Sequence, residues 1–201
     1  MRCHYGDRVA SYRCARTGEY LCMEHACLDV VSATTWEKLP PLPVRRAEPR
    51  DYAAIREMAM MYWDETEVEC FDRTYDVLNL PAFVAVSDSE VAGLLSYALD
   101  HEQDWLNIVM LNVHPEYQGR HIARCLLTKA EEEARAHGLS RIVVATSNDD
   151  LLALYVYQRW GFVISELRPG AILQHHGGEE AGFATIPVRD EIRLEKRVIT
   201  R

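Results

Sequence analysis

The sequence contains no apolar stretch that approaches the roughly 20 residues needed to cross a bilayer. Its first eight residues, MRCHYGDR, are polar where a secretion signal needs an apolar segment. It has no internal repeat and no long low-complexity tract. We therefore expect a folded cytoplasmic protein without a membrane partner. With 48% apolar residues, a chain of 201 residues can form one ordinary domain and a small appendage.

The sequence also has few positively charged residues. The 22 lysines and arginines are outnumbered by 31 aspartates and glutamates, which gives a formal net charge of -9. Because binding to nucleic acid needs a concentrated basic surface, this balance argues against nucleic acid as the main partner. Cationic or amine-bearing partners fit it better.

Cysteine is sparse along most of the chain but crowded at its start. Cys70 and Cys125 stand alone, whereas four of the six cysteines fall in the first 27 residues, namely Cys3, Cys14, Cys22 and Cys27. In a reducing cytoplasm, clustered thiols with nearby histidines indicate a metal before a disulfide. The alternative is a set of ordinary thiols and histidines in a poorly ordered tail.

The spacing within this cluster predicts one zinc ion. Two residues separate Cys22 from His25, which lets a chain turn place both ligands on one ion. We expect Cys3, Cys14, Cys22 and His25 to be the ligands, with His4 or Cys27 as substitutes. The segment YRCARTGEYLC resembles treble-clef or B-box-like fingers, although Thr17 stands where such modules usually have a second cysteine.

A proline-rich segment marks the domain boundary. The stretch SATTWEKLPPLPVRR has three prolines within four positions, which stiffens the chain in an extended form. We therefore predict a zinc-finger domain at 1–31, a linker at 32–43 and a larger domain at 44–201.

The larger domain alternates strand and helix patterns. We expect a short strand from residue 44 and a helix at 52–65 capped by Asp51, whereas the pattern at 66–79 is ambiguous and leaves a second short helix ending before Pro81 open. Three strands within 82–113 are separated by the polar turns SDSE and HEQD, as in an antiparallel meander. The expected later elements are a helix at 119–137, a strand at 141–146, a helix at 151–160 capped by Asn148 or Asp149, and strands at 162–167 and 190–198. This order predicts a mixed α/β fold.

The junction between the meander and the next helix is a candidate phosphate site. A helix that starts directly after a strand presents backbone N–H groups that have no partner within the helix and whose dipoles favour an anion. Arg120 adds positive charge there, Gly119 lets the backbone come close, and the small Ala123 leaves room for a ligand. The alternative is an ordinary strand-to-helix connection with Gln118 and Arg120 facing solvent.

Two segments resemble the GNAT superfamily of N-acetyltransferases. VHPEYQGRHIARCLL is similar to its acetyl-CoA signature, whose phosphate loop has Gln or Arg, two residues, Gly, one residue, then Gly or Ala. Gln118 and Ala123 match this loop, whereas His121 stands where the family usually has glycine. TSNDDLLALYVYQRWGF resembles the family's later segment through Asn148, Tyr157, Gly161 and Phe162. The resemblance covers about residues 44–165 and implies a GNAT-like, mainly antiparallel mixed sheet flanked by helices.

This resemblance implies acetyl-CoA as cosubstrate and direct transfer of the acetyl group to an amine, without an acyl-enzyme. In the family, backbone groups of the strand before the loop bind the pantetheine arm, the loop binds the pyrophosphate, and a tyrosine protonates the CoA sulfur as general acid. The residues placed in these roles are Leu111, Asn112 and Val113 for the arm, Gln118, Gly119, Arg120, His121, Ile122 and Ala123 for the pyrophosphate, Asn148 for a further contact with the arm, and Tyr157 as the acid.

The general base and the acceptor are not fixed by the sequence. An acidic stretch borders the expected acceptor region and either attracts a cationic amine or forms a solvated face; it comprises Asp64, Glu65, Glu67, Glu69 and Asp72. Cys125 and Cys70 are interpreted as structural thiols. The acceptor is an amine-bearing small molecule, a peptide or a protein, and the sequence leaves a protein partner of the finger and a homodimer open.

Three functions follow for the whole chain. The first is an acetyl-CoA-dependent N-acetyltransferase with a zinc finger. The second is a non-catalytic GNAT-like binding module, disabled by His121, in which the finger contacts a protein. The third is a thiol redox or metal-sensing protein that uses the cysteines between Cys3 and Cys27.

Metal analysis of the purified protein tests the zinc prediction. A closed set of four ligands should retain one zinc per chain through dialysis, because thiolate and imidazole ligands hold the ion tightly. Rapid loss of the metal would instead favour the sensor, and protein that never contains zinc would contradict the predicted finger.

Overall fold

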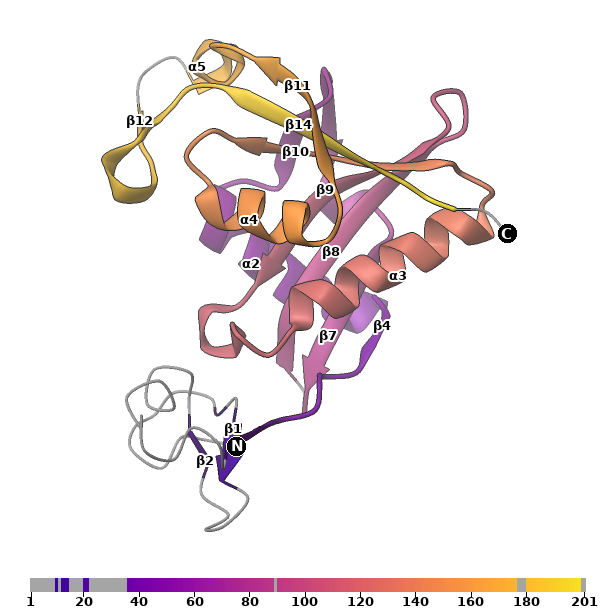
Figure 1. The fold of residues 1–201 in the computed structure, drawn as a ribbon, viewed down its shortest axis with the longest axis vertical. Coiled ribbons are helices and arrows are strands. Elements are labelled where there is room, and N and C mark those ends of the chain that lie inside the picture. Colours follow the sequence, from indigo (N-terminus) through magenta and orange to yellow (C-terminus); the bar gives the residue numbers. More distant parts are fainter. Residues whose placement is uncertain are drawn as a thin grey trace.

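A seven-stranded sheet organises the larger part of the protein (Figure 1). The structure is a computed structural model that describes residues 10, 12–14, 20–21, 36–88, 90–176 and 180–199. The strand order is β11-β14-β10-β9-β8-β7-β4, and all neighbours are antiparallel except β9 and β10. The predicted mixed, mainly antiparallel sheet is therefore confirmed. Its strands are β4 (Val44–Arg46), β7 (Ala82–Ser87), β8 (Glu90–Asp100), β9 (Trp105–Val113), β10 (Arg141–Ser147), β11 (Val163–Arg168) and β14 (Glu191–Arg197).

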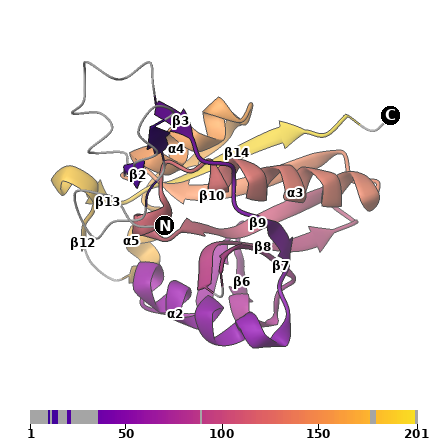
Figure 2. The same cartoon turned by 90° about the horizontal axis from the view of Figure 1, so that it is seen from below.

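Helices cover both faces of this sheet, as Figure 2 shows. One face carries α3 (Ile122–Ala136) and α4 (Leu151–Arg159), and the other carries α2 (Tyr52–Trp63) with the hairpin of β5 (Glu67–Cys70) and β6 (Arg73–Asp76). Each side has its own cluster of buried apolar side chains. The burial of these two clusters is the main force that holds the layers together.

The meander of β7, β8 and β9 forms as the alternating pattern predicts. Before Pro81 the chain forms a single short 3-10 helix at Val77–Asn79, and the residues ahead of it, β5 and β6, pair as a hairpin that the sequence did not indicate. The reason is the period of two in β5, where Val68 and Cys70 are buried against α2 while their neighbours face solvent.

The helix starts differ from the predicted caps. Asp51 precedes α2, but its carboxylate accepts hydrogen bonds from the Arg45 guanidinium, at 2.6 and 2.9 Å, and from the Glu48 N–H, at 2.7 Å. Asp51 is the N-cap residue of α2, as predicted, but its side chain ties β4 to the start of the helix and accepts no hydrogen bond from a helical N–H. At α4 the cap is Asp150, whose side chain accepts from the Ala153 N–H at 2.9 Å. The predicted caps Asn148 and Asp149 are wrong.

The long helix α3 begins at Ile122, three residues later than predicted. Its first turn lies so close to β8 that a β-carbon on Gly93 would be 2.7 Å from Ile122 Cγ2, so glycine is needed there. Near the other end, the buried Glu133 accepts hydrogen bonds from Tyr97 and Arg46 at 2.9 and 2.5 Å. Gly138 ends the helix with a φ of 69°.

The segment between β11 and β14 folds over the end of the sheet and contains more structure than the sequence indicated. It forms α5 (Ala171–His176), the paired strands β12 (Glu180–Ala181) and β13 (Pro187–Val188), and a 3-10 turn at Phe183–Thr185. Among the described helices, none is long and apolar enough to cross a membrane.

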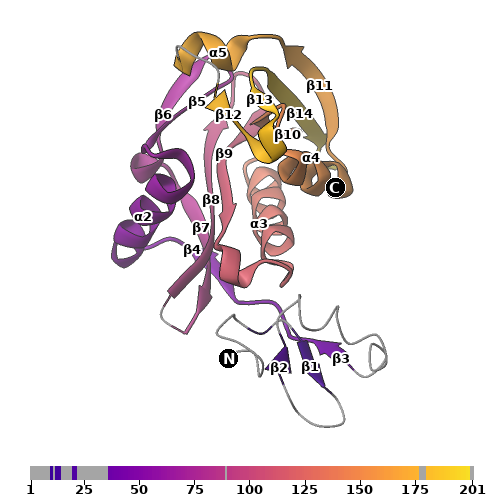
Figure 3. The ribbon, with the colours of Figure 1, turned by 90° about the vertical axis from the view of Figure 1, so that its left-hand side faces the viewer.

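The N-terminal part includes a separate small sheet, visible in Figure 3. Its order is β2 (Tyr20–Leu21), β1 (Tyr12–Cys14) and β3 (Trp36–Lys38). Strand β3 lies within the segment 32–43 that the sequence predicted as a linker. Because β3 pairs with β1, this part of the segment belongs to the small sheet. Cys14 lies in β1, whereas the other predicted zinc ligands, Cys3, Cys22 and His25, and the substitutes His4 and Cys27 lie outside the described residues.

Candidate active site

The site forms where β9 and β10 stop pairing. These parallel strands are hydrogen-bonded from Trp105 and Arg141 to Ile108 and Val144. Beyond that point β9 continues to Val113 and β10 to Ser147 without pairing to each other. The sheet therefore opens between them at the end that also carries the start of α3, and backbone groups at this opening need other partners.

The register shows which backbone groups of β9 face the opening. The His114 N–H donates to the Ala92 carbonyl at 3.0 Å, and hydrogen-bonded positions alternate along an antiparallel pair. The backbone of Asn112 therefore faces β8, while that of Leu111 and Val113 faces the opening. In agreement, the Tyr62 hydroxyl donates to the Val113 carbonyl at 2.8 Å from the side of α2.

A cavity of about 240 Å³ occupies this opening on the α2 side. It is lined by side chains from α2, β9, the end of β10 and the 3-10 turn after β12. Asn112 points its side chain here and accepts a 3.4 Å hydrogen bond from Trp63 Nε1. The lining residues are Tyr62, Trp63, Asn112, Ser147, Asp149, Asp150 and Phe183.

The start of α3 is suited to an anion. The first backbone hydrogen bond into the helix is from the Cys125 N–H to the His121 carbonyl, at 3.1 Å. No side chain caps the helix and its first turn holds no acidic residue. Within the described chain, several N–H groups here lack a hydrogen-bond acceptor, namely those of Gly119, Arg120, Ile122, Ala123 and Arg124. Their dipoles and the helix dipole together attract negative charge.

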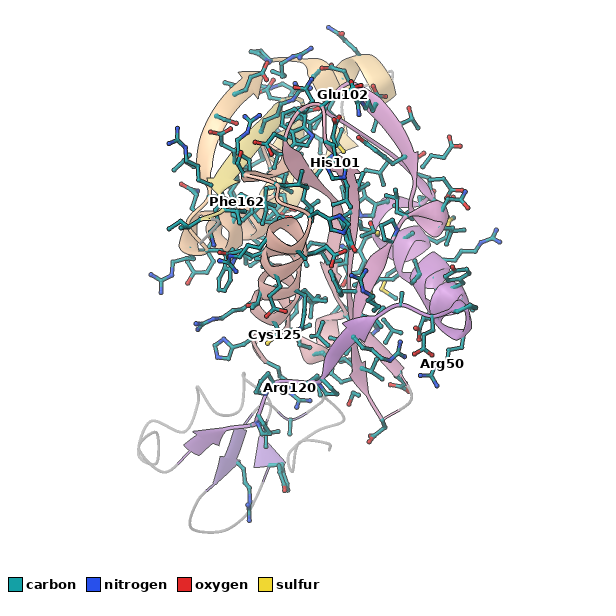
Figure 4. The ribbon with its side chains drawn as sticks, turned by 90° about the vertical axis from the view of Figure 1, so that its right-hand side faces the viewer. Arg50, His101, Glu102, Arg120, Cys125 and Phe162 are labelled. Atoms are coloured by element: carbon teal, nitrogen blue, oxygen red, sulfur yellow. The ribbon has the colours of Figure 1, made fainter. Side chains whose placement is uncertain are left out.

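Arg120 contributes a positive charge that no carboxylate neutralises among the described residues. Its Nη2 donates to the Pro40 carbonyl at 3.4 Å, and its Nε is buried without a partner. Burial lowers the pKa of this guanidinium from its ordinary value. Figure 4 shows Arg120 at the end of α3 that faces the small N-terminal sheet. Gln118 and Gly119 beside it are exposed.

His121 has a left-handed backbone, with φ of 59° and ψ of 19°. This explains the glycine that the GNAT pattern has at this position, since glycine adopts positive φ without steric cost. The sequence alone left open whether this residue was already helical, and it is not. Histidine tolerates the left-handed region better than most residues, so the loop forms with some local strain.

Tyr157 is the buried tyrosine of α4. Its side chain is 5% exposed and its ring lies 5.5 Å from that of Phe162, whereas Tyr155 is 62% exposed. The Tyr157 hydroxyl has no hydrogen-bond partner among the described residues. Burial raises its pKa well above the ordinary value, and the nearby Asp150 adds to the effect. The hydroxyl therefore keeps its proton at neutral pH and can donate it.

The side chain of Asn148 is already engaged by the segment before β14. Its Oδ1 accepts from the N–H groups of Arg189 and Asp190 at 2.8 and 2.9 Å, and its Nδ2 donates to the Pro187 carbonyl at 3.0 Å. A direct contact with a cofactor would have to use the second Nδ2 hydrogen. Its predicted contact with the pantetheine arm stays a prediction.

The two isolated cysteines have the properties of structural thiols. Burial raises the pKa of Cys70 to about 11, against a hydrogen bond that its sulfur accepts from Asn107 Nδ2 at 3.3 Å. Burial also raises the pKa of the half-buried Cys125. Neither is ionised at neutral pH, as a nucleophile would need to be.

The carboxylates at the cavity are not those that the sequence suggested. None of the acidic stretch from Asp64 to Asp72 lines it, and Asp72 is paired with Arg193 and Arg168. Instead, the carboxylates that line the cavity belong to Asp149 and Asp150. The adjacent aspartates after β10 were a visible signal, but the sequence suggested only a capping role for Asp149.

Comparison with known proteins identifies the family. Residues 52–162 match the family described as Acetyltransferase (GNAT) family, which is more than half of the chain. The protein therefore belongs to this family and is a GNAT-family N-acetyltransferase.

Two curated relatives illustrate the similarity. The uncharacterized protein YxbD of Bacillus subtilis is 29% identical over 142 residues, covering 68% of this chain and 87% of its own. The L-amino acid N-acyltransferase MnaT of Escherichia coli is 26% identical over 143 residues, covering 64% of this chain and 83% of its own.

Solved structures share the fold. The IAA acetyltransferase from Bacillus cereus has a TM-score of 0.62 at 23% identity and covers 78% of this chain and 99% of its own. A Bacillus subtilis acetyltransferase in complex with CoA has a TM-score of 0.60 at 20% identity and covers 79% and 99%.

The left-handed backbone at residue 121 predicts a graded response to substitution. His121→Val should lower the free energy of unfolding in urea by about 1–2 kcal/mol relative to His121→Gly, because a β-branched side chain is strained at positive φ. His121→Asn, which tolerates this region, should stay close to the wild type. Equal stability of the valine and glycine variants would show that φ at this position is not positive.

Proposed function

We propose that this protein transfers an acetyl group from acetyl-CoA directly to a primary amine of an acceptor. The observation that carries this proposal is the opening between β9 and β10, which combines an unpaired strand edge, N–H groups without acceptors at the start of α3, and a cavity on the opposite side. A long cofactor and a separate acceptor can therefore meet in one gap.

The diphosphate of acetyl-CoA would lie at the start of α3. The N–H groups of Gly119, Arg120, Ile122 and Ala123 would donate to its oxygens, and the Arg120 side chain would add charge from the same loop. The Gln118 side chain is exposed and would contact the same ligand. Ile122 contributes only its N–H, since its side chain packs on Gly93.

The pantetheine arm would continue along β9. The outward-facing backbone groups of Leu111 and Val113 would pair with its amides and polarise the thioester carbonyl. Asn112, whose backbone faces β8, would act through its side chain at the acceptor cavity. The second Nδ2 hydrogen of Asn148 is the remaining candidate contact with the arm.

Tyr157 would act as the general acid. When the amine nitrogen attacks the thioester carbon, the C–N bond forms and the C–S bond breaks, and the departing thiolate takes a proton from the phenol. The phenol recovers a proton from the solvent or from the new amide nitrogen. A protonated phenol on a buried tyrosine is consistent with this role.

A non-catalytic binding module is the alternative. The feature that favours it is His121, whose side chain stands where the family pattern has glycine. Such a module would not bind acetyl-CoA even at millimolar concentration, which separates it from the enzyme.

We also propose that residues 1–31 hold one structural zinc through Cys3, Cys14, Cys22 and His25. Residues 32–43 would link this unit to the enzyme domain at 44–201. The finger would recruit a protein. The support is the clustering and spacing of these side chains in the sequence.

The role of Tyr157 predicts a separation of turnover from binding. Tyr157→Phe should lower kcat by about 100-fold or more and change the Kd of acetyl-CoA by less than about threefold, because only the proton donor is lost. Calorimetry and CoA-release assays measure the two quantities. Tyr155→Phe, an exposed position two residues away on the same helix, is the matched control and should keep wild-type turnover. Unchanged turnover in Tyr157→Phe would remove the proposed acid.

A further inference from the structure

Asp149 is a buried carboxylate with an unused oxygen at the cavity. Its side chain lines the cavity, yet the residue is only 8% exposed. Oδ2 accepts from the Phe183 N–H at 3.0 Å, whereas Oδ1 is buried and has no hydrogen-bond partner among the residues that the structure describes. An acceptor oxygen without a partner is costly in a folded protein, so a donor from a ligand is the natural complement.

The chain holds this carboxylate in place. A β-carbon on Gly182 would lie 2.0 Å from Asp149 Oδ2 and 2.8 Å from Val188 Cγ2, so the backbone before Phe183 passes directly over the carboxylate. Any residue larger than glycine would push Asp149 aside. The carboxylate is therefore held in place beside the cavity that Asp149 lines.

The remaining walls of the cavity suit an organic cation. Three aromatic side chains, Tyr62, Trp63 and Phe183, line it and are partly exposed. Asp150 is the second carboxylate of the cavity. None of the described residues that line the cavity is a lysine, arginine or histidine. Aromatic faces and carboxylates attract an ammonium group, whereas a carboxylate on the ligand would find no positive partner.

We infer that Asp149 binds the ammonium group of the acceptor and removes its proton, and that the acceptor is a primary amine on an apolar or aromatic body with no carboxylate beside the amino group. This inference rests on the proposed acetyl transfer and specifies its base and its acceptor class.

The proton balance is complete with these groups. Asp149 takes one proton from the ammonium, which leaves a neutral amine with a free electron pair. The amine nitrogen attacks the thioester carbon, the C–N bond forms and the C–S bond breaks. The second proton lost by the nitrogen reaches the thiolate by way of Tyr157 or the solvent. The products are the amide, CoA with a free thiol, and one proton that Asp149 returns to the solvent.

A matched pair of acceptors tests the substrate class. 2-Phenylethylamine and L-phenylalanine share the same ring and chain and differ in the carboxylate next to the amino group. With acetyl-CoA and the full-length protein, we expect kcat/KM for CoA release to be at least about tenfold higher with 2-phenylethylamine, because the carboxylate of phenylalanine would be repelled by Asp149 and Asp150. Equal or faster release with L-phenylalanine would overturn the acceptor class.

A matched pair of variants tests the base. Asp149→Asn keeps an oxygen that can accept from the Phe183 N–H but loses the proton acceptor, so kcat/KM for 2-phenylethylamine should fall about 100-fold while acetyl-CoA affinity is retained. Asp150→Asn removes the same charge from the same cavity and keeps the α4 cap, since asparagine caps as well as aspartate. Because the Asp150 charge attracts the ammonium group but does not take its proton, this loss should appear in KM, and kcat should stay within about fivefold of the wild type.

The outcomes separate this inference from the proposed function. If the wild type does not bind acetyl-CoA in calorimetry, the proposed function itself is overturned. If it binds acetyl-CoA but releases no CoA with 2-phenylethylamine, the acceptor class is wrong. If it transfers to 2-phenylethylamine and the two variants lose equal activity, Asp149 is not the base.

Discussion

The divergence of β9 from β10 after Ile108 and Val144 is the constraint on which the site depends. A sheet that opens leaves polar backbone groups on the edge of β9, and such groups need a partner from outside the sheet. The same opening places the uncapped start of α3 near one side and the cavity below α2 on the other. Gly93 makes this arrangement compact, because it lets Ile122 approach β8.

Much of this fold could be predicted from the sequence, because the elements that form it have strong local periods. The meander within 82–113, helix α3 and the final strand all follow from alternating or helical apolar patterns. The hairpin β5–β6 was missed, since its short strands alternate over only four residues each and depend on packing against α2. At the site, the resemblance to the GNAT pattern pointed to Tyr157, which is buried whereas Tyr155 is exposed, and its role as the acid stays a prediction.

The carboxylate at the cavity, Asp149, could not be found in this way. Asp149 becomes buried through a backbone contact with Phe183, which lies 34 residues further along the chain, and through the close passage of Gly182. No local pattern reports such a contact. The sequence directed attention to the acidic stretch from Asp64 to Asp72, which the fold places away from the cavity and partly neutralises with arginines. At His121 the sequence showed that the residue departs from the GNAT pattern, but not why glycine is usual there. The left-handed backbone of the structure supplies the reason.

We propose that one gap in the sheet holds the cofactor from the α3 side and the acceptor from the α2 side. A crystal structure with bound CoA tests this proposal. We expect diphosphate oxygens about 2.7–3.2 Å from the N–H groups at the start of α3, and the pantetheine arm against Leu111 and Val113 between β9 and β10. CoA bound elsewhere, with the start of α3 left without the diphosphate or closed by the His121 side chain, would contradict it.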